Sequence, residues 1–213
     1  ELVDYDGELQ DDTFRHRYGE TLPTWLIDKC EDCGWKHPTH IQQRVLDTVL
    51  LDANVTDVVV QAQTGSGKTL SYLLPCLASI DASRSAVQAL IVVPTRELGL
   101  QVSRVAKRLA KPQNIMVMSV LQGSQNRRQR AWAWADPPQL VIGTPDELCK
   151  IIQLGGIKRY NSIRFIVVDE VDACLLNDYG NALQSSGTPL HELLSKLLSP
   201  TYDDGKDRAD DET

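Results

Sequence analysis

Five short apolar runs alternate along the chain with longer segments whose apolar residues recur at helical spacing. The runs lie at 57–60, 89–93, 115–118, 139–142 and 165–168. Nearly continuous apolar character is typical of parallel strands that are covered on both faces. Helices are expected at about 40–51, 67–80, 96–110, 124–135, 145–154 and 189–198. The alternation predicts a single α/β domain, an open parallel sheet with helices on both faces.

The negative charge of the chain is concentrated at its two ends. The 213 residues have a formal net charge of −7. Residues 1–12 hold six acids and no base, and residues 203–213 hold six acids and two bases, so the rest of the chain carries +3. We expect an acidic tail at 1–12, a folded body at 13–200, and an acidic tail or part of an insertion at 201–213. Because the rest of the chain is mildly basic, its charge is compatible with a nucleic-acid partner.

The composition indicates in which cellular compartment the protein is expected. No apolar run approaches the roughly 18 residues that a membrane span requires, and the first four residues have neither the basic start nor the apolar core of a signal peptide. An odd number of cysteines, five, argues against a disulfide framework. Cys30 and Cys33 share a helical face with Leu22 and Leu26, which favours packed helix cysteines over a zinc or redox pair. We expect a soluble, intracellular, monomeric protein with no membrane partner.

A glycine-rich loop follows the run at 57–60. The loop reads Ala62-Gln63-Thr64-Gly65-Ser66-Gly67-Lys68-Thr69 and leads into an apolar helix. Gly65 and Gly67 permit a tight turn whose backbone N–H groups point at phosphates, and the helix that follows adds the positive end of its dipole. Lys68 would reach the outer phosphates and the Thr69 hydroxyl would bind Mg²⁺. Ala62 stands where the general pattern has glycine, yet a nucleotide-phosphate site is strongly favoured over a chance turn.

Acidic residues follow the run at 165–168, in the order Asp169-Glu170-Val171-Asp172. An aspartate at the end of a buried strand can hold Mg²⁺ through water, and Glu170 could activate the attacking water as a general base. A protease recognition site or a plain acidic loop is the less favoured interpretation of the same letters. Together, the loop and the acids predict a nucleoside triphosphatase site.

Residues upstream of the glycine-rich loop indicate which nucleotide base the site selects. The Asn-Lys-x-Asp signature of guanine-specific sites is absent, and Gln42 could donate to and accept from the N7/N6 edge of adenine. We therefore expect ATP and Mg²⁺ as the cofactors.

Together these motifs resemble the DEAD-box RNA helicases, in particular their N-terminal RecA-like domain. The matching segments are 38–42 (the Q motif), 62–69 (motif I), 94–98 (motif Ia) and 169–172 (motif II, with Val171 in place of Ala). The resemblance covers residues from about 20 to 175 with the motifs in the family's order. It implies a RecA-like fold, with Lys68 and Glu170 as catalytic residues. It also implies a nucleotide and metal site formed by Gln42, Thr64, Gly65, Ser66, Gly67, Lys68, Thr69 and Asp169.

The resemblance further implies RNA contacts that are largely independent of sequence. The candidates are Pro94, Thr95, Arg96, Gly123 and Thr144, with Arg127, Arg128 and Arg130 as a basic cluster that serves the same face or is simply solvated. The family's Thr-Pro-Gly-Arg reads Thr-Pro-Asp-Glu here, which places Asp146 and Glu147 beside the expected phosphate track. We expect these two charges to weaken RNA contact. An upstream aromatic that stacks on adenine is implied near Phe14 or Tyr18.

In this family a second RecA-like domain completes the enzyme, and the sequence shows no such domain. We expect the chain to bind ATP but to hydrolyse it negligibly alone and not to unwind duplexes. Two alternatives stay open: an RNA clamp or interaction module with little ATPase activity, and a DNA-directed helicase or translocase. The motif II variant and the stretch at 132–138 resemble plastid-type plant members, which suggests a chloroplast location.

Overall fold

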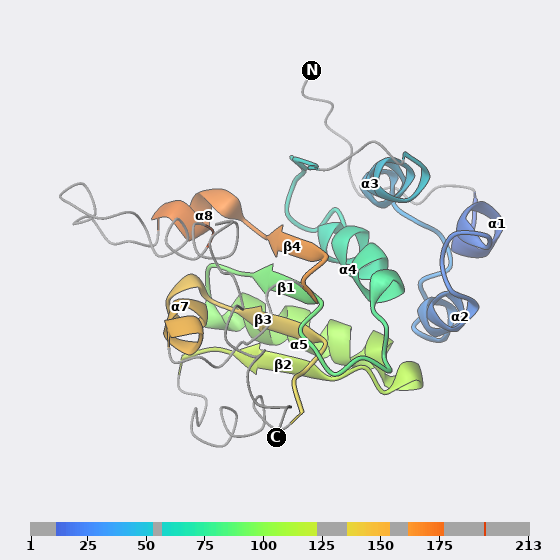
Figure 1. Ribbon diagram of the computed structural model, residues 1–213. Coiled ribbons are helices and arrows are strands. Elements are labelled where there is room, and N and C mark those ends of the chain that lie inside the picture. Colours follow the sequence, from blue (N-terminus) through green and yellow to red (C-terminus); the bar gives the residue numbers. More distant parts are fainter. Residues whose placement is uncertain (1–11, 53–56, 123–135, 154–161, 177–193, 195–213) are drawn as a thin grey trace, which may run out of the picture.

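The computed structural model describes residues 12–52, 57–122, 136–153, 162–176 and 194 (Figure 1). In chain order the elements are α1 (Phe14–Tyr18), α2 (Thr24–Asp32), α3 (His40–Leu51), α4 (Lys68–Ser79), β1 (Ala89–Val92), α5 (Arg96–Ala110), η1 (Lys111–Gln113), β2 (Val117–Val120), β3 (Leu140–Gly143), α7 (Pro145–Gln153), β4 (Phe165–Val168) and α8 (Val171–Leu176). The helices predicted at 40–51 and 96–110 coincide with α3 and α5. The helix predicted at 124–135, and nearly all of the one at 189–198, lie outside the described residues.

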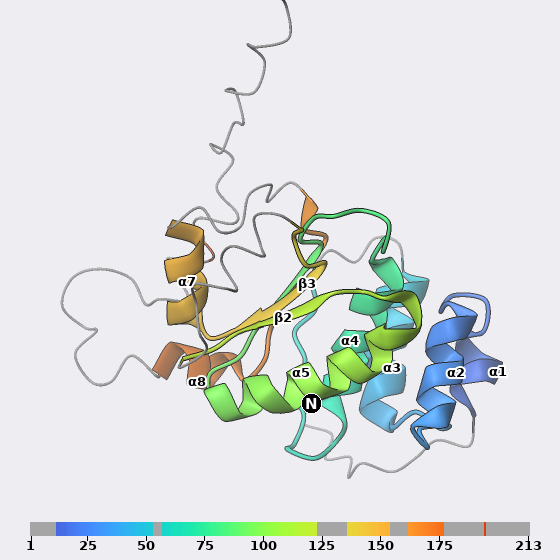
Figure 2. The same ribbon diagram turned by 90° about the horizontal axis from the view of Figure 1, so that it is seen from below.

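Four of the five predicted strands form one parallel sheet in the order β2-β3-β1-β4. β1 pairs with β3 from Ala89 opposite Leu140, and with β4 from Ala89 opposite Phe165. β2 joins the other edge of β3. Figures 1 and 2 show α5 crossing one face of the sheet and α7 and α8 on the other. The predicted α/β architecture with helices on both faces is therefore confirmed.

The prediction of a strand at 57–60 is wrong. These residues form no ladder with the described strands, and Val59 is 97% exposed. A strand needs a neighbour that accepts and donates its backbone hydrogen bonds, and β-propensity reflects packing against such a neighbour rather than an intrinsic preference. Without that packing, three consecutive valines remain apolar and exposed. β4, at the sheet edge, is accordingly only partly buried along its length.

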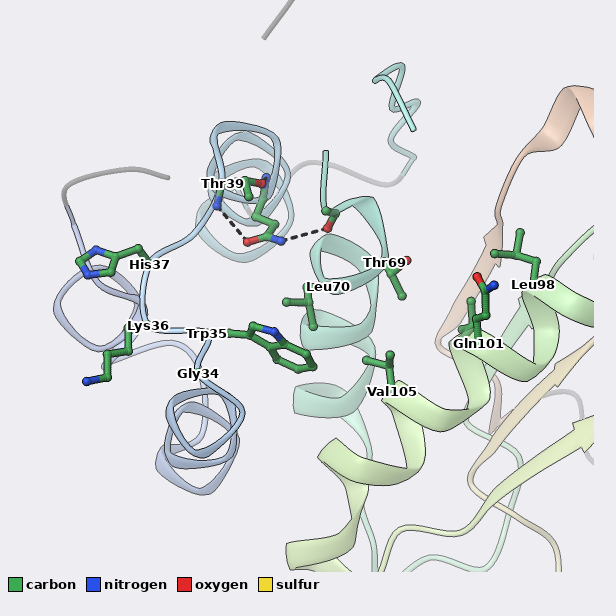
Figure 3. Close-up of a pocket in the computed structure, with 13 residues that line it drawn as sticks. Gly34, Trp35, Lys36, His37, Thr39, Thr69, Leu70, Leu98, Gln101 and Val105 are labelled. Atoms are coloured by element: carbon green, nitrogen blue, oxygen red, sulfur yellow. Dashed lines mark hydrogen bonds between the residues drawn. The ribbon is translucent and has the colours of Figure 1, made fainter. Parts of the chain in front are cut away.

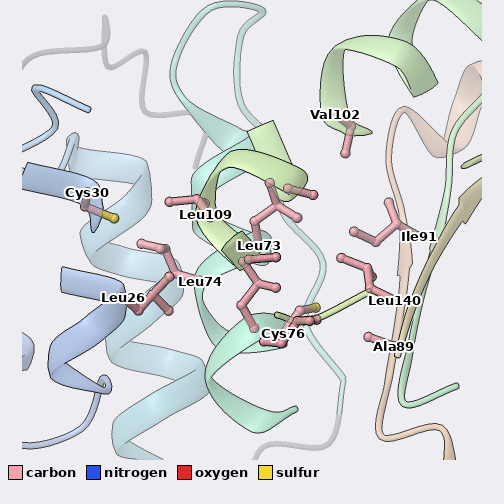
Figure 4. Packing of buried hydrophobic residues seen from close by; sticks show 14 of the residues in the cluster. Leu26, Cys30, Leu73, Leu74, Cys76, Ala89, Ile91, Val102, Leu109 and Leu140 are labelled. Carbon is pink, nitrogen blue, oxygen red and sulfur yellow. The ribbon is translucent and has the colours of Figure 1, made fainter. Parts of the chain in front are cut away.

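The sheet separates two apolar clusters. Successive residues of β1 point to opposite faces, so Ala89 and Ile91 join the larger cluster while Leu90 and Val92 join the smaller one. The larger cluster lies between α4, α5 and the sheet and extends to α1 and α2, with Leu26, Leu73 and Leu74 fully buried (Figure 4). The smaller cluster lies beneath α7 and α8. Both faces of β1 are therefore sealed, which explains its continuous apolar sequence.

Two buried glutamines hold the amino-terminal edge of the sheet. The Gln88 amide accepts from the backbone N–H of Asp81 at 2.9 Å and donates to the carbonyl of the same residue at 2.8 Å. The Gln139 amide accepts from the Met116 N–H at 2.8 Å and donates to the Arg84 carbonyl at 3.3 Å. Buried polar groups are stable only when paired in this way. The loop after α4 is thereby fixed to the strands.

The cysteines match the packed interpretation where they can be compared. Cys30 is buried within α2, and burial raises the pKa of its thiol to about 12. Cys33 is partly buried at the end of the same helix and, like Cys30, is a free thiol. A buried thiol with a raised pKa is a poor nucleophile and metal ligand. Separately, none of the helices in the described part of the chain has both the length and the apolar character to cross a bilayer.

The close packing at the end of β3 allows a test of the fold. A Cβ atom added at Gly143 would lie 2.7 Å from the Val120 carbonyl oxygen and 2.8 Å from Leu148. We expect Gly143→Ala to decrease the free energy of unfolding by about 1–3 kcal/mol, because β2 and α7 must both move. Urea unfolding measures the change, with the exposed Gln113→Ala as a control expected to stay within about 0.5 kcal/mol. Equal stability of the two variants would contradict this packing.

Candidate functional site

The carboxyl ends of all four strands meet at one edge of the sheet, because the strands are parallel. Three residues predicted to bind ligands follow shortly after strands: Thr95 after β1, Thr144 after β3 and Asp169 after β4. In open parallel sheets this edge is the ordinary place for a ligand site. The predicted convergence of the motifs is observed for these segments.

The glycine-rich loop has the backbone that the sequence predicts. Gly65 and Gly67 both have positive φ, at +86° and +90°, which few side-chain-bearing residues adopt. The Ser66 hydroxyl donates to the Gln63 carbonyl at 2.8 Å and closes the turn. Lys68 begins α4, and its Nζ donates to the Ala62 carbonyl at 2.6 Å. The lysine head therefore lies over its own loop, at the start of a helix whose first N–H groups face the same side.

Thr39 and Gln42 connect the start of α3 to this loop. They form a capping box, in which the Thr39 hydroxyl accepts from the Gln42 backbone N–H and the Gln42 side-chain oxygen Oε1 accepts from the Thr39 backbone N–H. The same side chains donate outward: the Thr39 hydroxyl to the Ser66 carbonyl at 2.9 Å and the Gln42 amide to the Gly67 carbonyl at 3.0 Å. A Cβ atom at position 67 would collide with the Gln42 amide. Glycine is thus required at 67 by close approach as well as by φ.

A pocket of about 500 Å³ borders these contacts (Figure 3). Its walls come from the segment before α3, the first turn of α4 and one side of α5. Figure 3 shows the Trp35 ring pointing between Leu70 of α4 and Val105 of α5. Of the predicted nucleotide-binding residues, Gln42, Gly67 and Thr69 line the pocket. One Gln42 amide N–H is used by Gly67, and a second N–H remains for a ligand; the adenine contact stays a prediction.

Asp169 is fixed by contacts to three elements. Its backbone N–H donates to the Val92 carbonyl at 2.9 Å, and its carbonyl accepts from the Cys174 thiol at 3.4 Å. Its carboxylate Oδ2 accepts from the Tyr72 hydroxyl at 2.8 Å. Burial raises the pKa of Tyr72, the Asp169 carboxylate raises it further, and a hydrogen bond with the Thr69 side chain lowers it. The helix that follows the glycine-rich loop is thereby joined to motif II.

Glu170 has a left-handed backbone, with φ at +47°. Such a conformation is uncommon for a residue with a side chain and is often found where function requires it. The residue is exposed, and its carbonyl accepts from the Cys174 N–H at 2.9 Å as α8 begins. Burial and the neighbouring carboxylates raise the pKa of the Cys174 thiol to about 12. Glu170 therefore lies exposed at the carboxyl-terminal edge of the sheet, next to Asp169.

The donor atoms near Asp169 fit Mg²⁺. This ion prefers oxygen ligands and usually keeps several waters, using one or two carboxylates together with phosphate oxygens. The Asp169 carboxylate accepts a hydrogen bond from the Tyr72 hydroxyl, and the Thr69 side chain lowers the pKa of the same phenol, so oxygens of the right kind lie near it. Within the described ranges no group of three or more His, Cys, Asp or Glu side chains could hold a metal by itself. A metal at this place would need ligand or water oxygens as well.

Two of the residues predicted to contact RNA are exposed at the carboxyl-terminal edge. The Thr95 hydroxyl caps α5 by accepting from the Leu98 N–H at 3.2 Å. Arg96 donates from Nε to the Gln122 carbonyl at 3.0 Å, which joins motif Ia to the segment after β2. Pro94 is buried beneath them. Gly123 and the arginines at 127, 128 and 130 lie outside the described residues.

The carboxylates after Thr144 do not share one environment. Asp146 is exposed, whereas Glu147 is 7% exposed and pairs with Lys150 at 2.8 Å across one turn of α7. The expectation that both charges face the RNA side is therefore wrong for Glu147. The sequence pattern could not separate the two residues, because neighbouring positions on a helix point about 100° apart and only packing decides which is buried. Thr144 itself is partly exposed at the start of α7.

The aromatic residues proposed to stack on adenine are both in the core. Phe14 is 1% exposed and Tyr18 is 0% exposed, and the Tyr18 hydroxyl donates to Asp47 at 2.8 Å. Neither ring has a free face for a base, so the expectation that one of them stacks is wrong for this structure. The sequence analysis did not single out Tyr72, which contacts Asp169. Its position three residues after Thr69, one helical turn along α4, is the signal that could have found it.

Comparisons with known proteins agree with this geometry. Residues 39–206 match the model of the DEAD/DEAH box helicase family. The chain is 42% identical over 160 residues to DEAD-box ATP-dependent RNA helicase 58, chloroplastic, of Oryza sativa subsp. japonica, covering 75% of this chain and 35% of that protein. It is 43% identical over 156 residues to the protein of the same name in Arabidopsis thaliana, covering 71% and 32%.

A solved structure supports the fold. The structure of S. cerevisiae Dbp5 bound to RNA and ADP BeF3 resembles the chain with a TM-score of 0.70 at 22% identity, covering 86% of this chain and 42% of that one. The fold is therefore that of a RecA-like DEAD-box domain, as predicted. The chain spans about a third of the length of the curated relatives that it matches.

The link between Gln42 and the glycine-rich loop generates a stability prediction. In Gln42→Glu a carboxylate oxygen replaces the amide that donates to the Gly67 carbonyl, and two acceptors then face each other. We expect the free energy of unfolding to fall by about 1–3 kcal/mol at neutral pH, the usual effect of a buried acceptor that loses its donor. Urea unfolding measures it. The exposed Gln113→Glu makes the same change of charge, and an equal loss in both variants would contradict a specific role for Gln42.

Proposed function

The chain belongs to the DEAD/DEAH box helicase family, and on that premise we propose that it is the ATP- and Mg²⁺-binding N-terminal half of an ATP-dependent RNA helicase. One observation carries the proposal. The helix that begins at the glycine-rich loop is hydrogen-bonded to Asp169 of motif II, 97 residues away in the sequence. Phosphate-binding and metal-binding groups are thereby held at one edge of the sheet, which is what phosphoryl transfer requires.

The glycine-rich loop binds the phosphates. Backbone N–H groups from the loop and the first turn of α4 donate to the phosphate oxygens, and the helix dipole favours the negative charge. Lys68, whose Nζ now donates to the Ala62 carbonyl, exchanges that acceptor for a phosphate oxygen. Gln42 supplies specificity for adenine through the second N–H of its amide.

Thr69 and Asp169 hold the metal, Asp169 partly through water. When bound, Mg²⁺ neutralises charge that develops on the phosphate oxygens. Glu170, exposed beside Asp169 and held in the left-handed conformation, accepts a proton from the attacking water as general base. Asp169 and Glu170, the two residues that follow β4, thus divide the two tasks between them.

The RNA binds at the same edge of the sheet, at the starts of α5 and α7. Thr95 and Arg96 donate to the backbone of the RNA from the start of α5, and Thr144 donates from the start of α7. Pro94 shapes the turn that presents them, and Gly123, outside the described residues, is proposed as a further RNA contact. These contacts read phosphates and sugars rather than bases, so binding is independent of sequence. RNA, not DNA, is the partner because the relatives are named RNA helicases.

A second RecA-like domain completes the enzyme in the full-length protein, since the matching relatives are about three times as long as the aligned region. Such a domain brings the arginine that stabilises the transferring phosphate, worth about 10³–10⁵ in turnover. The chain alone is a monomer that binds nucleotide, hydrolyses it very slowly and does not separate strands. The names of the two plant relatives support a chloroplast location.

The proposed phosphate site predicts the nucleotide affinity of the chain. The chain is expected to bind the fluorescent nucleotide mant-ADP in the presence of Mg²⁺. Lys68→Ala is expected to weaken binding by roughly 10- to 100-fold, the usual effect of one charged hydrogen bond. Fluorescence titration measures the dissociation constants, and Lys107→Ala on the exposed face of α5 is the matched control. Binding by Lys68→Ala at the original affinity would contradict the assignment of the loop.

The alternative, an RNA clamp with little ATPase activity, has a direct test in the full-length protein. Glu170→Gln is expected to retain RNA and nucleotide binding and to lose RNA-dependent phosphate release. Unchanged phosphate release would remove Glu170 from catalysis, and absence of RNA-dependent release in the unsubstituted protein would favour the clamp.

A further prediction separates the two carboxylates of α7. Asp146→Asn and Glu147→Gln each remove one negative charge, but Asp146 is exposed at the proposed RNA face and Glu147 is buried against Lys150. We expect Asp146→Asn to strengthen binding of single-stranded RNA by about two- to fivefold at low salt, with the gain fading as salt rises. Glu147→Gln is expected to leave RNA affinity unchanged. The reverse order, measured by fluorescence anisotropy in the full-length protein, would contradict the proposed RNA face.

A further inference from the structure

A tyrosine outside the recognised motifs contacts the proposed metal ligand. The Tyr72 hydroxyl donates to Oδ2 of Asp169 at 2.8 Å, and the Thr69 side chain lies close enough to lower the pKa of the phenol. Tyr72 is part-buried and lies on α4, one turn beyond Thr69. The Tyr72 hydroxyl therefore contacts Asp169, one of the two residues proposed to hold Mg²⁺, and Tyr72 shares α4 with the other, Thr69.

Among the residues that the structure describes, Tyr72 is the hydrogen-bond partner of the Asp169 carboxylate. The backbone of Asp169 is already held by the Val92 carbonyl and the Cys174 thiol. Without Tyr72 the carboxylate could still rotate about its side-chain bonds. Because Tyr72 uses Oδ2, the second oxygen, Oδ1, keeps its lone pairs for water or metal. Carboxylates that bind metals are commonly oriented by such partners, whose loss reduces metal affinity about 10- to 100-fold.

We propose that Tyr72 is a positioning residue that orients the Asp169 carboxylate for Mg²⁺ and aligns it with the glycine-rich loop; this inference rests on the proposed function. Tyr72 stands on the helix that begins at Lys68, so the loop and the carboxylate are set by one rigid element. The residue does not touch the reacting atoms. Its effect is confined to the contribution that Mg²⁺ makes to nucleotide binding.

The chain contains a matched control. The Tyr18 hydroxyl donates to Asp47 at 2.8 Å, so a tyrosine–carboxylate hydrogen bond occurs at a second place, although the Tyr18 ring is fully buried. Asp47 lies five residues beyond Gln42 on α3, which turns it about 140° away from the contact with the loop. Tyr18→Phe therefore removes an equivalent hydrogen bond outside the proposed metal site.

The experiment measures mant-ADP dissociation constants for the full chain with Mg²⁺ and with EDTA, in the original sequence, Tyr72→Phe and Tyr18→Phe. Phenylalanine retains the ring, so the core packing of both variants is kept, and circular dichroism checks the fold. We expect Tyr72→Phe to bind metal-free mant-ADP within about twofold of the original and to lose roughly 10-fold of the gain that Mg²⁺ gives. Tyr18→Phe is expected to keep that gain, although it is less stable to urea.

A second pair of variants makes the test specific. In an Asp169→Asn background, Tyr72→Phe is expected to cause no further loss of the Mg²⁺ gain, because its target is gone. A full Mg²⁺ gain in Tyr72→Phe, an equal loss with and without metal, or an additive loss on top of Asp169→Asn would overturn the inference and leave the proposed function intact. Absence of Mg²⁺-dependent binding in the original sequence would overturn both.

Discussion

The parallel pairing of β1 with β3 on one side and β4 on the other is the constraint on which the site depends. Because all three strands run in the same direction, the segments that follow them leave the sheet at one edge. The Asp169 N–H continues this pairing by donating to the Val92 carbonyl at 2.9 Å. The apolar residues of β1 make the arrangement rigid, since they are buried on both faces. Motifs far apart in the sequence thus become neighbours through backbone hydrogen bonds alone.

The strands alone do not place the glycine-rich loop, which is held by side chains. Thr39 and Gln42 start α3 and bind the loop carbonyls of Ser66 and Gly67 with the same polar groups. Tyr72 then joins the helix after the loop to Asp169. Each of these bonds pairs groups that are partly withdrawn from water, where an unpaired polar atom is unfavourable. The loop is therefore positioned by a few specific hydrogen bonds rather than by apolar packing.

This difference explains how much the sequence could predict. Runs such as 89–93 and 139–142 announce buried strands, because their burial on both faces leaves a one-dimensional pattern, and caps such as Thr95 mark the helix starts. The run at 57–60 has the same pattern, yet it is exposed and outside the sheet. The apolar residues of a segment indicate that it could be buried, but they do not show whether a partner strand lies beside it. The burial of Glu147 and the hydrogen bond from Tyr72 to Asp169 likewise depend on residues that are close in the fold but are not evident from the sequence pattern.

The exposure of the edge bears on why the chain alone is proposed to be nearly inactive. Glu170, Thr95 and Arg96 are exposed, and Asp169 is only partly buried. Electrostatic stabilisation of phosphoryl transfer is strongest where water is excluded, because the local dielectric constant is then low. A fixed Asp169 and a strained Glu170 supply orientation without that exclusion. A second surface that covers this edge would strengthen every charge interaction already in place, so the proposed second domain can act by removing water as well as by adding an arginine.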